Sequence, residues 1–157
     1  MKEKLSVLRA LAAALNDASI TWAVGASVLL YCNGIVEQFN DIDILVMEDD
    51  VERVRELLLS VGTPAPPNPS EKYATKHFLE FSVDGVDVDV MAGFAIICDG
   101  VTHDCALRRE QIVEWTTLDG VAIPLQSVEL WRGYYQLMGR EVKVELIDRV
   151  CVRGDRL

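Results

Sequence analysis

Two aspartates separated by one aliphatic residue have the clearest chemical potential in this chain. Asp41 and Asp43 begin the segment Asp-Ile-Asp-Ile-Leu-Val, in which acidic and aliphatic residues alternate. In a strand, this alternation sends both carboxylates to one face and the aliphatic side chains to the other. Carboxylates on one face repel each other, and a divalent cation such as Mg²⁺, which prefers oxygen ligands and often also holds a phosphate, explains the pair. The alternative is that both form the solvated face of an edge strand.

A further carboxylate comes from a later segment. Residues 86–91 read Val-Asp-Val-Asp-Val-Met, so Asp87 and Asp89 share one strand face, and alternation alone does not choose between them. Three converging carboxylates can hold two Mg²⁺ ions about 4 Å apart. One ion lowers the pKa of an attacking hydroxyl, and the other bridges nucleotide phosphates and stabilises a departing pyrophosphate. The sequence therefore predicts metal-dependent phosphate chemistry.

The third feature is a short apolar run that ends in Gly25-Ala26-Ser27. We expect a strand that turns sharply into a helix at this point. Gly25 would allow close backbone approach, the free amides at the start of the helix would cradle a phosphate, and Ser27 would add a hydroxyl donor. The alternative is an ordinary helix start with a serine near its cap.

Together these residues resemble the nucleotidyltransferase superfamily with the DNA polymerase beta-like catalytic fold, in its small, single-domain bacterial and archaeal branch. The resemblance covers roughly residues 20–91 and extends faintly through 120–124. It favours Asp89 over Asp87, because Val-Asp-Val-Met is most similar to the strand that bears the family's third carboxylate. It implies three catalytic carboxylates that bind Mg²⁺ or Mn²⁺, Asp41, Asp43 and Asp89, and a nucleotide-binding turn of Gly25, Ala26 and Ser27.

The chain departs from the family pattern at its basic residues and at one glycine. Ala26 replaces the commoner second glycine, and residues 37–40 lack the arginine that many relatives carry before Asp-x-Asp. Tyr135 stands where relatives often have a lysine, five residues before an arginine like Arg140. Fewer cations would weaken the binding of a triphosphate. The cations in this region that could substitute are Arg132, Arg140 and Lys143.

The positions of turn residues and apolar repeats predict the elements that hold these side chains. They indicate an α/β (α+β) fold in which helices flank a mixed β-sheet. The resemblance implies that residues 1–157 form one nucleotidyltransferase-like domain. Two hairpins are expected around Asp84-Gly85 and Asp119-Gly120. The expected helices are 2–16, 26–31, 49–61 (capped by Asp49 or Asp50) and a C-terminal pair from about 127 that breaks at Gly139. The expected strands are 20–24, 41–46, 77–83 and 86–91, residues 116–123 form the second hairpin, and 62–70 is an irregular loop.

Composition narrows the class of protein. The 15 basic and 25 acidic residues give a formal charge of −10, which argues against an extended nucleic-acid-binding surface. The longest apolar run, residues 22–32, is too short to cross a bilayer of about 30 Å. The charged start and the four cysteines without a CxxC pair favour reduced thiols in the cytoplasm and no secretory leader.

The function predicted from the sequence is transfer of a nucleoside monophosphate from an NTP, with ATP the expected donor, to a hydroxyl-type acceptor that the sequence does not identify. The alternatives are a non-catalytic binding module with the same fold and the small partner of a toxin–antitoxin pair; a homodimer stays open. Cys98, His103 and Cys105 are zinc-type ligands, but their spacing fits no common zinc motif. The aromatic residues that could stack a base, but are expected in the core, are Trp115, Trp131, Tyr134 and Tyr135.

Overall fold

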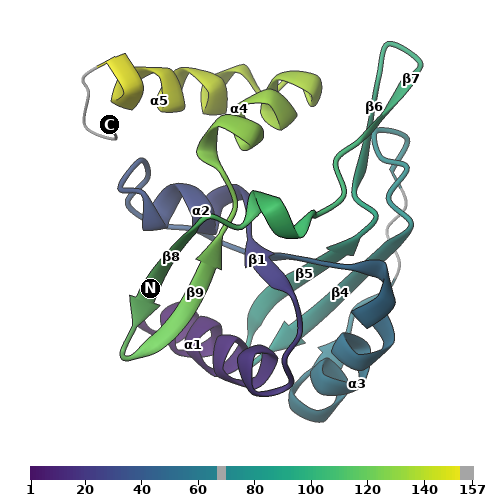
Figure 1. Ribbon diagram of the computed structural model, residues 1–157, viewed down its shortest axis with the longest axis vertical. Helices are drawn as coiled ribbons and strands as arrows, with labels where there is room; N and C mark the ends of the chain where they lie inside the picture. The colour runs from purple at the N-terminus through teal and green to yellow at the C-terminus, as the bar shows by residue number, and fades with distance from the viewer. Residues whose placement is uncertain (67–69, 153–157) are drawn as a thin grey trace.

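A computed structural model describes residues 1–66 and 70–152 of the chain (Figure 1). Within these residues, a seven-stranded mixed sheet has the strand order β3-β4-β5-β2-β1-β9-β8, and helices flank it. The predicted α+β class is therefore confirmed. The strands of this sheet are β1 (Trp22–Val24), β2 (Ile42–Val46), β3 (Thr63–Pro64), β4 (His77–Val83), β5 (Val86–Ala92), β8 (Glu114–Leu118) and β9 (Val121–Leu125).

Parallel pairing occurs at two places in an otherwise antiparallel sheet. β2 runs parallel to β5, and β1 runs parallel to β9. In the second pair, Val24 lies opposite Leu125. The β2–β5 register sets Asp43 directly opposite Asp89. On the other side of β5, the antiparallel register sets Glu80 of β4 opposite the same aspartate. Three neighbouring strands thus carry one acidic residue each in a single row across the sheet.

The two faces of these strands have different surroundings. Ile42, Ile44, Val88 and Val90 alternate with the acidic residues and are almost fully buried. They belong to the main hydrophobic core, to which α1 (Lys2–Asp17) and α3 (Val51–Val61) contribute their apolar stripes. Figure 1 shows both helices packed along the lower side of the sheet. Burial of the aliphatic face therefore turns the acidic row toward the opposite side.

The remaining helices lie on the side of the acidic row. α2 (Ala26–Cys32) follows β1, and α4 (Val128–Leu137) and α5 (Glu141–Val152) lie next to each other at the C-terminal end (Figure 1). Gly139, at a φ of +75°, separates α4 from α5, as the sequence predicts. The Ser127 hydroxyl accepts a hydrogen bond from the Leu130 amide at 3.3 Å and so caps α4.

Both predicted hairpins form, and a third one accompanies them. Asp99-Gly100 joins β6 (Ala95–Cys98) to β7 (Val101–Asp104) in a separate two-stranded sheet. This hairpin has the same Asp-Gly turn signal as the other two, but the sequence analysis did not predict it. Its segment was considered only for the possible zinc ligands Cys98, His103 and Cys105. Short 3-10 helices span Glu48–Asp50 (η1) and Arg109–Gln111 (η2).

Several predicted boundaries are corrected by the structure. The first strand starts at Trp22 rather than residue 20, and the predicted loop 62–70 includes β3, while its residues 67–69 lie outside the described part. Asp50 occupies the N-cap position of α3 without capping it, because its carboxylate accepts a hydrogen bond from Arg53 at 2.9 Å instead. Among the described residues, no helix is both long and apolar enough to span a membrane.

Candidate active site

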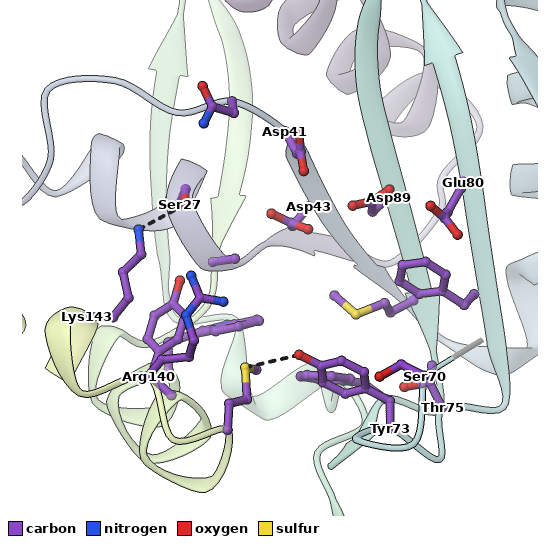
Figure 2. Close-up of a pocket in the computed structure, with 18 residues that line it drawn as sticks. Ser27, Asp41, Asp43, Ser70, Tyr73, Thr75, Glu80, Asp89, Arg140 and Lys143 are labelled. Carbon is purple, nitrogen blue, oxygen red and sulfur yellow. Dashed lines mark hydrogen bonds between the residues drawn. The ribbon is translucent and has the colours of Figure 1, made fainter. Parts of the chain in front are cut away.

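A pocket of about 760 Å³ lies between the acidic row of the sheet and the helices α2, α4 and α5. Figure 2 shows Asp41, Asp43 and Asp89 side by side in this pocket. Ala26 and Ser27, from the predicted nucleotide-binding turn, line it as well. The structure therefore brings five of the six predicted site residues to one cavity.

Asp43 and Asp89 are half-buried and face each other across the β2–β5 pairing. Burial raises the pKa of Asp43 to about 8, and the neighbouring Asp89 and Asp41 carboxylates add to the shift, while Lys143 and Arg140 oppose it. Burial also raises the pKa of Asp89 to about 7, with Asp41, Glu80 and Asp87 contributing repulsion. Without a cation, this site therefore disfavours its own negative charge.

Asp41 and Asp87 precede Asp43 and Asp89 by two residues and lie on the same face of the sheet. Asp41 lines the pocket, and its pKa is raised by burial and by the Asp87 carboxylate, against the opposite effect of Lys4. Asp87 is exposed and is not among the residues that line the pocket. The strand register thus separates two aspartates that alternation alone leaves equivalent: Asp89 is the one that lies opposite Asp43.

The chemistry of these side chains fits a divalent cation. Carboxylate oxygens are the ligands that Mg²⁺ prefers, and none of the described residues gives the Asp43 carboxylate a hydrogen bond or an ion pair within 4 Å. A cation would offset the repulsion that raises the pKa values of Asp43 and Asp89. Among the described residues, no group of three or more aspartate, glutamate, cysteine or histidine side chains is arranged so that it could hold a metal ion. Binding of an ion would therefore require the aspartate side chains to rotate toward it.

Gly25 is not among the residues that line the pocket, and the structure gives it a packing role. A Cβ atom at this position would lie 2.5 Å from the Trp131 indole, so the glycine is needed for packing against α4. Trp131 is 1% exposed, and its indole N–H donates to the Gln126 side chain at 2.7 Å. The glycine thus lets a buried tryptophan pack against the turn at residues 25–27.

Ala26 has the backbone conformation that glycine tolerates best. Its φ is +50°, in the left-handed region, where a Cβ atom costs roughly 1–2 kcal/mol. This explains physically why a second glycine would suit the turn, and it places backbone strain directly at the pocket wall. Ser27 is the last residue of this turn, and its side chain points into the cavity (Figure 2).

Two cations from the C-terminal helices face the carboxylates. The Lys143 ammonium lies 3.5 Å from the Ser27 hydroxyl, and Arg140 lines the same wall (Figure 2). Burial and the neighbouring Arg140 lower the pKa of Lys143, whereas Asp43 raises it. Arg132, the third cation suggested by the sequence, pairs instead with Asp148 at 2.6 Å. Burial raises the pKa of the Tyr135 hydroxyl, and the nearby Ser27 side chain is among the groups that oppose this shift.

The outer strand β4 adds residues that the sequence patterns did not single out. Glu80 and Phe78 line the far side of the pocket, beyond β5. Tyr73 bridges the opening toward α4, where its hydroxyl donates to the Met138 sulfur at 3.5 Å. Only the pairing of Glu80 with Asp89 places this carboxylate beside the site, and that pairing is tertiary information.

The competing assignments find less support. His103 and Cys98 occupy separate positions in the β6–β7 hairpin, and no described cluster there could hold a metal ion. Trp131, Tyr134 and Tyr135 are buried, and the Trp131 ring contacts those of Phe94, Tyr134 and Tyr135, as expected for core residues. In contrast to its predicted place in the core, Trp115 is 58% exposed on the edge strand β8.

Comparison with solved structures establishes the fold. A candidate nucleotidyltransferase of Thermotoga maritima, TM1012, superposes with a TM-score of 0.76 at 23% identity, over 98% of this chain and 95% of the other. The chain has the nucleotidyltransferase fold. The resemblance seen in the sequence is thereby confirmed at the level of architecture.

Two further structures share the nucleotidyltransferase fold at lower similarity. ANT(2'')-Ia, solved with adenylyl-2''-tobramycin, has a TM-score of 0.58 at 10% identity, over 97% of this chain and 99% of that one. The lincosamide antibiotic adenylyltransferase LnuA, solved with lincomycin, has a TM-score of 0.62 at 12% identity, over 94% and 96%. No protein-family model matches the chain, and no curated protein sequence matches it significantly.

Proposed function

We propose that this protein is a Mg²⁺-dependent (or Mn²⁺-dependent) nucleotidyltransferase that transfers a nucleoside monophosphate from an NTP, with ATP as donor, to a hydroxyl group. The observation that carries the proposal is the meeting of two complementary sets of side chains in one pocket. Asp41, Asp43 and Asp89 supply oxygen ligands, and Lys143 and Arg140 supply positive charge beside the Ser27 turn. Nucleotidyl transfer needs both a metal-binding and a phosphate-binding half. The shared fold with two antibiotic adenylyltransferases supports the same reaction class.

The residues have distinct roles in this reaction. When bound, the metal ions would lower the pKa of the acceptor hydroxyl and neutralise phosphate charge, held by Asp41, Asp43 and Asp89. The acceptor oxygen forms a bond to the α-phosphorus, the bond from that phosphorus to the pyrophosphate oxygen breaks, and pyrophosphate leaves. Asp89, opposite Asp43 on the neighbouring strand, accepts the hydroxyl proton. Lys143 and Ser27 hold the phosphates through charge-assisted and hydroxyl hydrogen bonds.

Donor binding is tested by thermal unfolding with Mg²⁺ and ATP. Ligand at a hundred times its dissociation constant adds about 2.7 kcal/mol to the free energy of unfolding. For a chain of this size, that raises the Tm by roughly 5–10 °C. The Asp43→Asn variant should lose the shift, because it removes a metal ligand. Formation of labelled AMP adducts and release of pyrophosphate with hydroxyl acceptors then test the transfer itself.

The Lys143→Ala substitution tests the phosphate-binding half. Loss of one charge-assisted hydrogen bond should raise the dissociation constant for Mg·ATP about tenfold, equivalent to about 1.4 kcal/mol. Lys72→Ala is the matched control, since Lys72 is exposed and does not line the pocket. Equal affinities of the two variants would remove Lys143 from the donor site. Wild-type protein that shows no metal-dependent shift with any NTP would favour a non-catalytic module instead.

A further inference from the structure

The helix α4 ends in a backbone turn that folds the next residues back over the helix. Gly139, at a φ of +75°, has the left-handed conformation, and its amide donates to the Gln136 carbonyl at 3.1 Å. The Arg140 amide donates to the Tyr135 carbonyl at 2.8 Å. These two hydrogen bonds form the Schellman motif, in which the residues joined by the wider bond commonly make an apolar contact. Arg140 and Tyr135 occupy those two positions in this chain.

The contact between these two side chains joins a cation to an aromatic ring. The guanidinium carbon of Arg140 lies 5.9 Å from the centroid of the Tyr135 ring. A guanidinium within about 6 Å of a ring centroid is attracted to the electron-rich face of the ring. Both side chains line the pocket, and Figure 2 labels Arg140 on the wall that also carries Lys143. The end of α4 therefore places a cation on an aromatic platform at the basic wall.

The Tyr135 ring is fixed by the core behind it. Tyr135 is 3% exposed, and its ring centroid lies 5.4 Å from that of Trp131. Trp131 in turn fills the space beside Gly25, as described above. Because protein cores are close-packed, the tyrosine ring has little room to change its rotamer. It is therefore a rigid support for the cation above it.

The Arg140 side chain depends on this support more than Lys143 does. None of the described residues gives the Arg140 guanidinium an ion pair or a side-chain hydrogen bond, whereas the Lys143 ammonium donates to Ser27 at 3.5 Å. A long side chain without restraint samples several rotamers, and ordering it when a ligand binds reduces affinity. Orientation matters for arginine in particular, because its planar guanidinium binds phosphate oxygens in pairs.

We propose that Tyr135 is a positioning residue, whose ring holds the Arg140 guanidinium toward the triphosphate of the donor before the donor binds. This inference rests on the function proposed above. Arg140 makes the contact with the phosphates, and Tyr135 acts only through Arg140. The aromatic ring carries the effect, so the tyrosine hydroxyl is dispensable for it.

The test is a double-mutant cycle on the binding of inorganic triphosphate with Mg²⁺, measured by calorimetry at low ionic strength. This probe requires the cations of the pocket but no acceptor and no transfer step. We expect Arg140→Ala and Tyr135→Leu each to weaken binding about tenfold. The double variant should bind within twofold of Arg140→Ala, because a residue that acts through Arg140 has no effect once Arg140 is gone. Tyr135→Phe keeps the ring and should bind within threefold of the wild type.

The control is Tyr134→Leu, which removes the neighbouring buried tyrosine of α4. Its ring contacts those of Phe94 and Trp131, and it does not line the pocket. This variant should lose stability as Tyr135→Leu does, yet bind triphosphate within twofold of the wild type. The proposal is overturned if Tyr135→Leu binds like the wild type, or if it weakens binding as much without Arg140 as with it, which would indicate a merely structural role.

A second measurement decides the matter where Tyr135→Leu does not fold. In NMR spectra, the Hδ protons of Arg140 should be shifted upfield by the ring in both the wild type and Tyr135→Phe, and their absence from the ring's shielding region would overturn the proposal. Wild-type protein that binds no triphosphate also overturns it. Triphosphate binding without any AMP transfer from ATP would instead contradict the proposed reaction and leave the positioning role supported.

Discussion

The opposed aspartates predict that removing one charge stabilises the metal-free protein. Asp43 and Asp89 face each other across neighbouring strands. Burial raises the pKa of Asp43 to about 8, with added repulsion from Asp89 and Asp41, and raises the pKa of Asp89 to about 7, with added repulsion from Asp41, Glu80 and Asp87. Asparagine has the shape of the protonated aspartate and carries no charge. The Asp43→Asn variant should therefore unfold at a higher temperature than the wild type when divalent cations are removed by EDTA at pH 8.5.

The size of this effect follows from the strand spacing. Register partners on adjacent strands lie about 5 Å apart, and two unit charges at that distance repel by about 3 kcal/mol at an effective dielectric constant of 20. Both side chains are only half-buried, so solvent screening reduces the expected gain to about 1–2 kcal/mol. For a chain of this length, that corresponds to a rise in Tm of roughly 2–8 °C.

The sign of the pH dependence makes the prediction specific. An acid whose folded-state pKa is raised adds stability below its unfolded pKa of about 4 and loses it as pH rises through the folded value. The wild type should thus lose stability between about pH 4 and pH 8, and the advantage of Asp43→Asn should be much smaller at pH 5 than at pH 8.5. Glu56→Gln, at an exposed position on α3, should stay within about 0.5 kcal/mol of the wild type at both pH values. An Asp43→Asn variant that is less stable at pH 8.5, or that gains equally at pH 5, would refute the electrostatic explanation.

Two further predictions concern the turn at residues 25–27, each with a matched control, and both are measured as free energies of chemical unfolding. Gly25→Ala should lower the free energy of unfolding by about 1–3 kcal/mol, because the added Cβ meets the buried Trp131 ring at 2.5 Å. In the control Gly133→Ala, on α4, the added Cβ meets nothing within 4 Å, and the variant should be more stable by about 0.5–1 kcal/mol. A Gly25→Ala variant as stable as the wild type would show that the ring moves freely. Ala26→Gly should be neutral or stabilising by up to about 1 kcal/mol, since it relieves a φ of +50°. Ala10→Gly on the exposed side of α1 should cost about 1 kcal/mol, and an equal cost at both alanines would argue against strain in the turn.

The local patterns of the sequence account for most of the elements and for the acidic face. Asp-Gly dipeptides located two of the three described hairpins, and alternation placed Asp41 and Asp43 on one face. Alternation could not separate Asp87 from Asp89, because two residues of equal parity share a face. That choice depends on the register between β2 and β5, which is set by the packing of the whole sheet.

The basic half of the site was less accessible to sequence reasoning. Arg132, Arg140 and Lys143 were equivalent candidates in the sequence, and only the packing of α5 against α4 assigns them. Arg132 forms an ion pair with Asp148, whereas the Lys143 ammonium donates a hydrogen bond to the Ser27 hydroxyl. Glu80 carried no signal at all, since a single glutamate in a strand is ordinary until its cross-strand partner is known.

The contact between Lys143 and Ser27 joins residues 116 positions apart and has a consequence for folding order. The strands that carry the carboxylates, β2, β4 and β5, are complete by residue 92, long before the ribosome adds the two cations. The residues of the acidic row are therefore synthesised before those of α4 and α5. A variant truncated before residue 128 would retain every predicted metal ligand and lack both pocket cations, Arg140 and Lys143. A single stop codon would then separate the residues proposed to bind metal from the cations proposed to bind nucleotide.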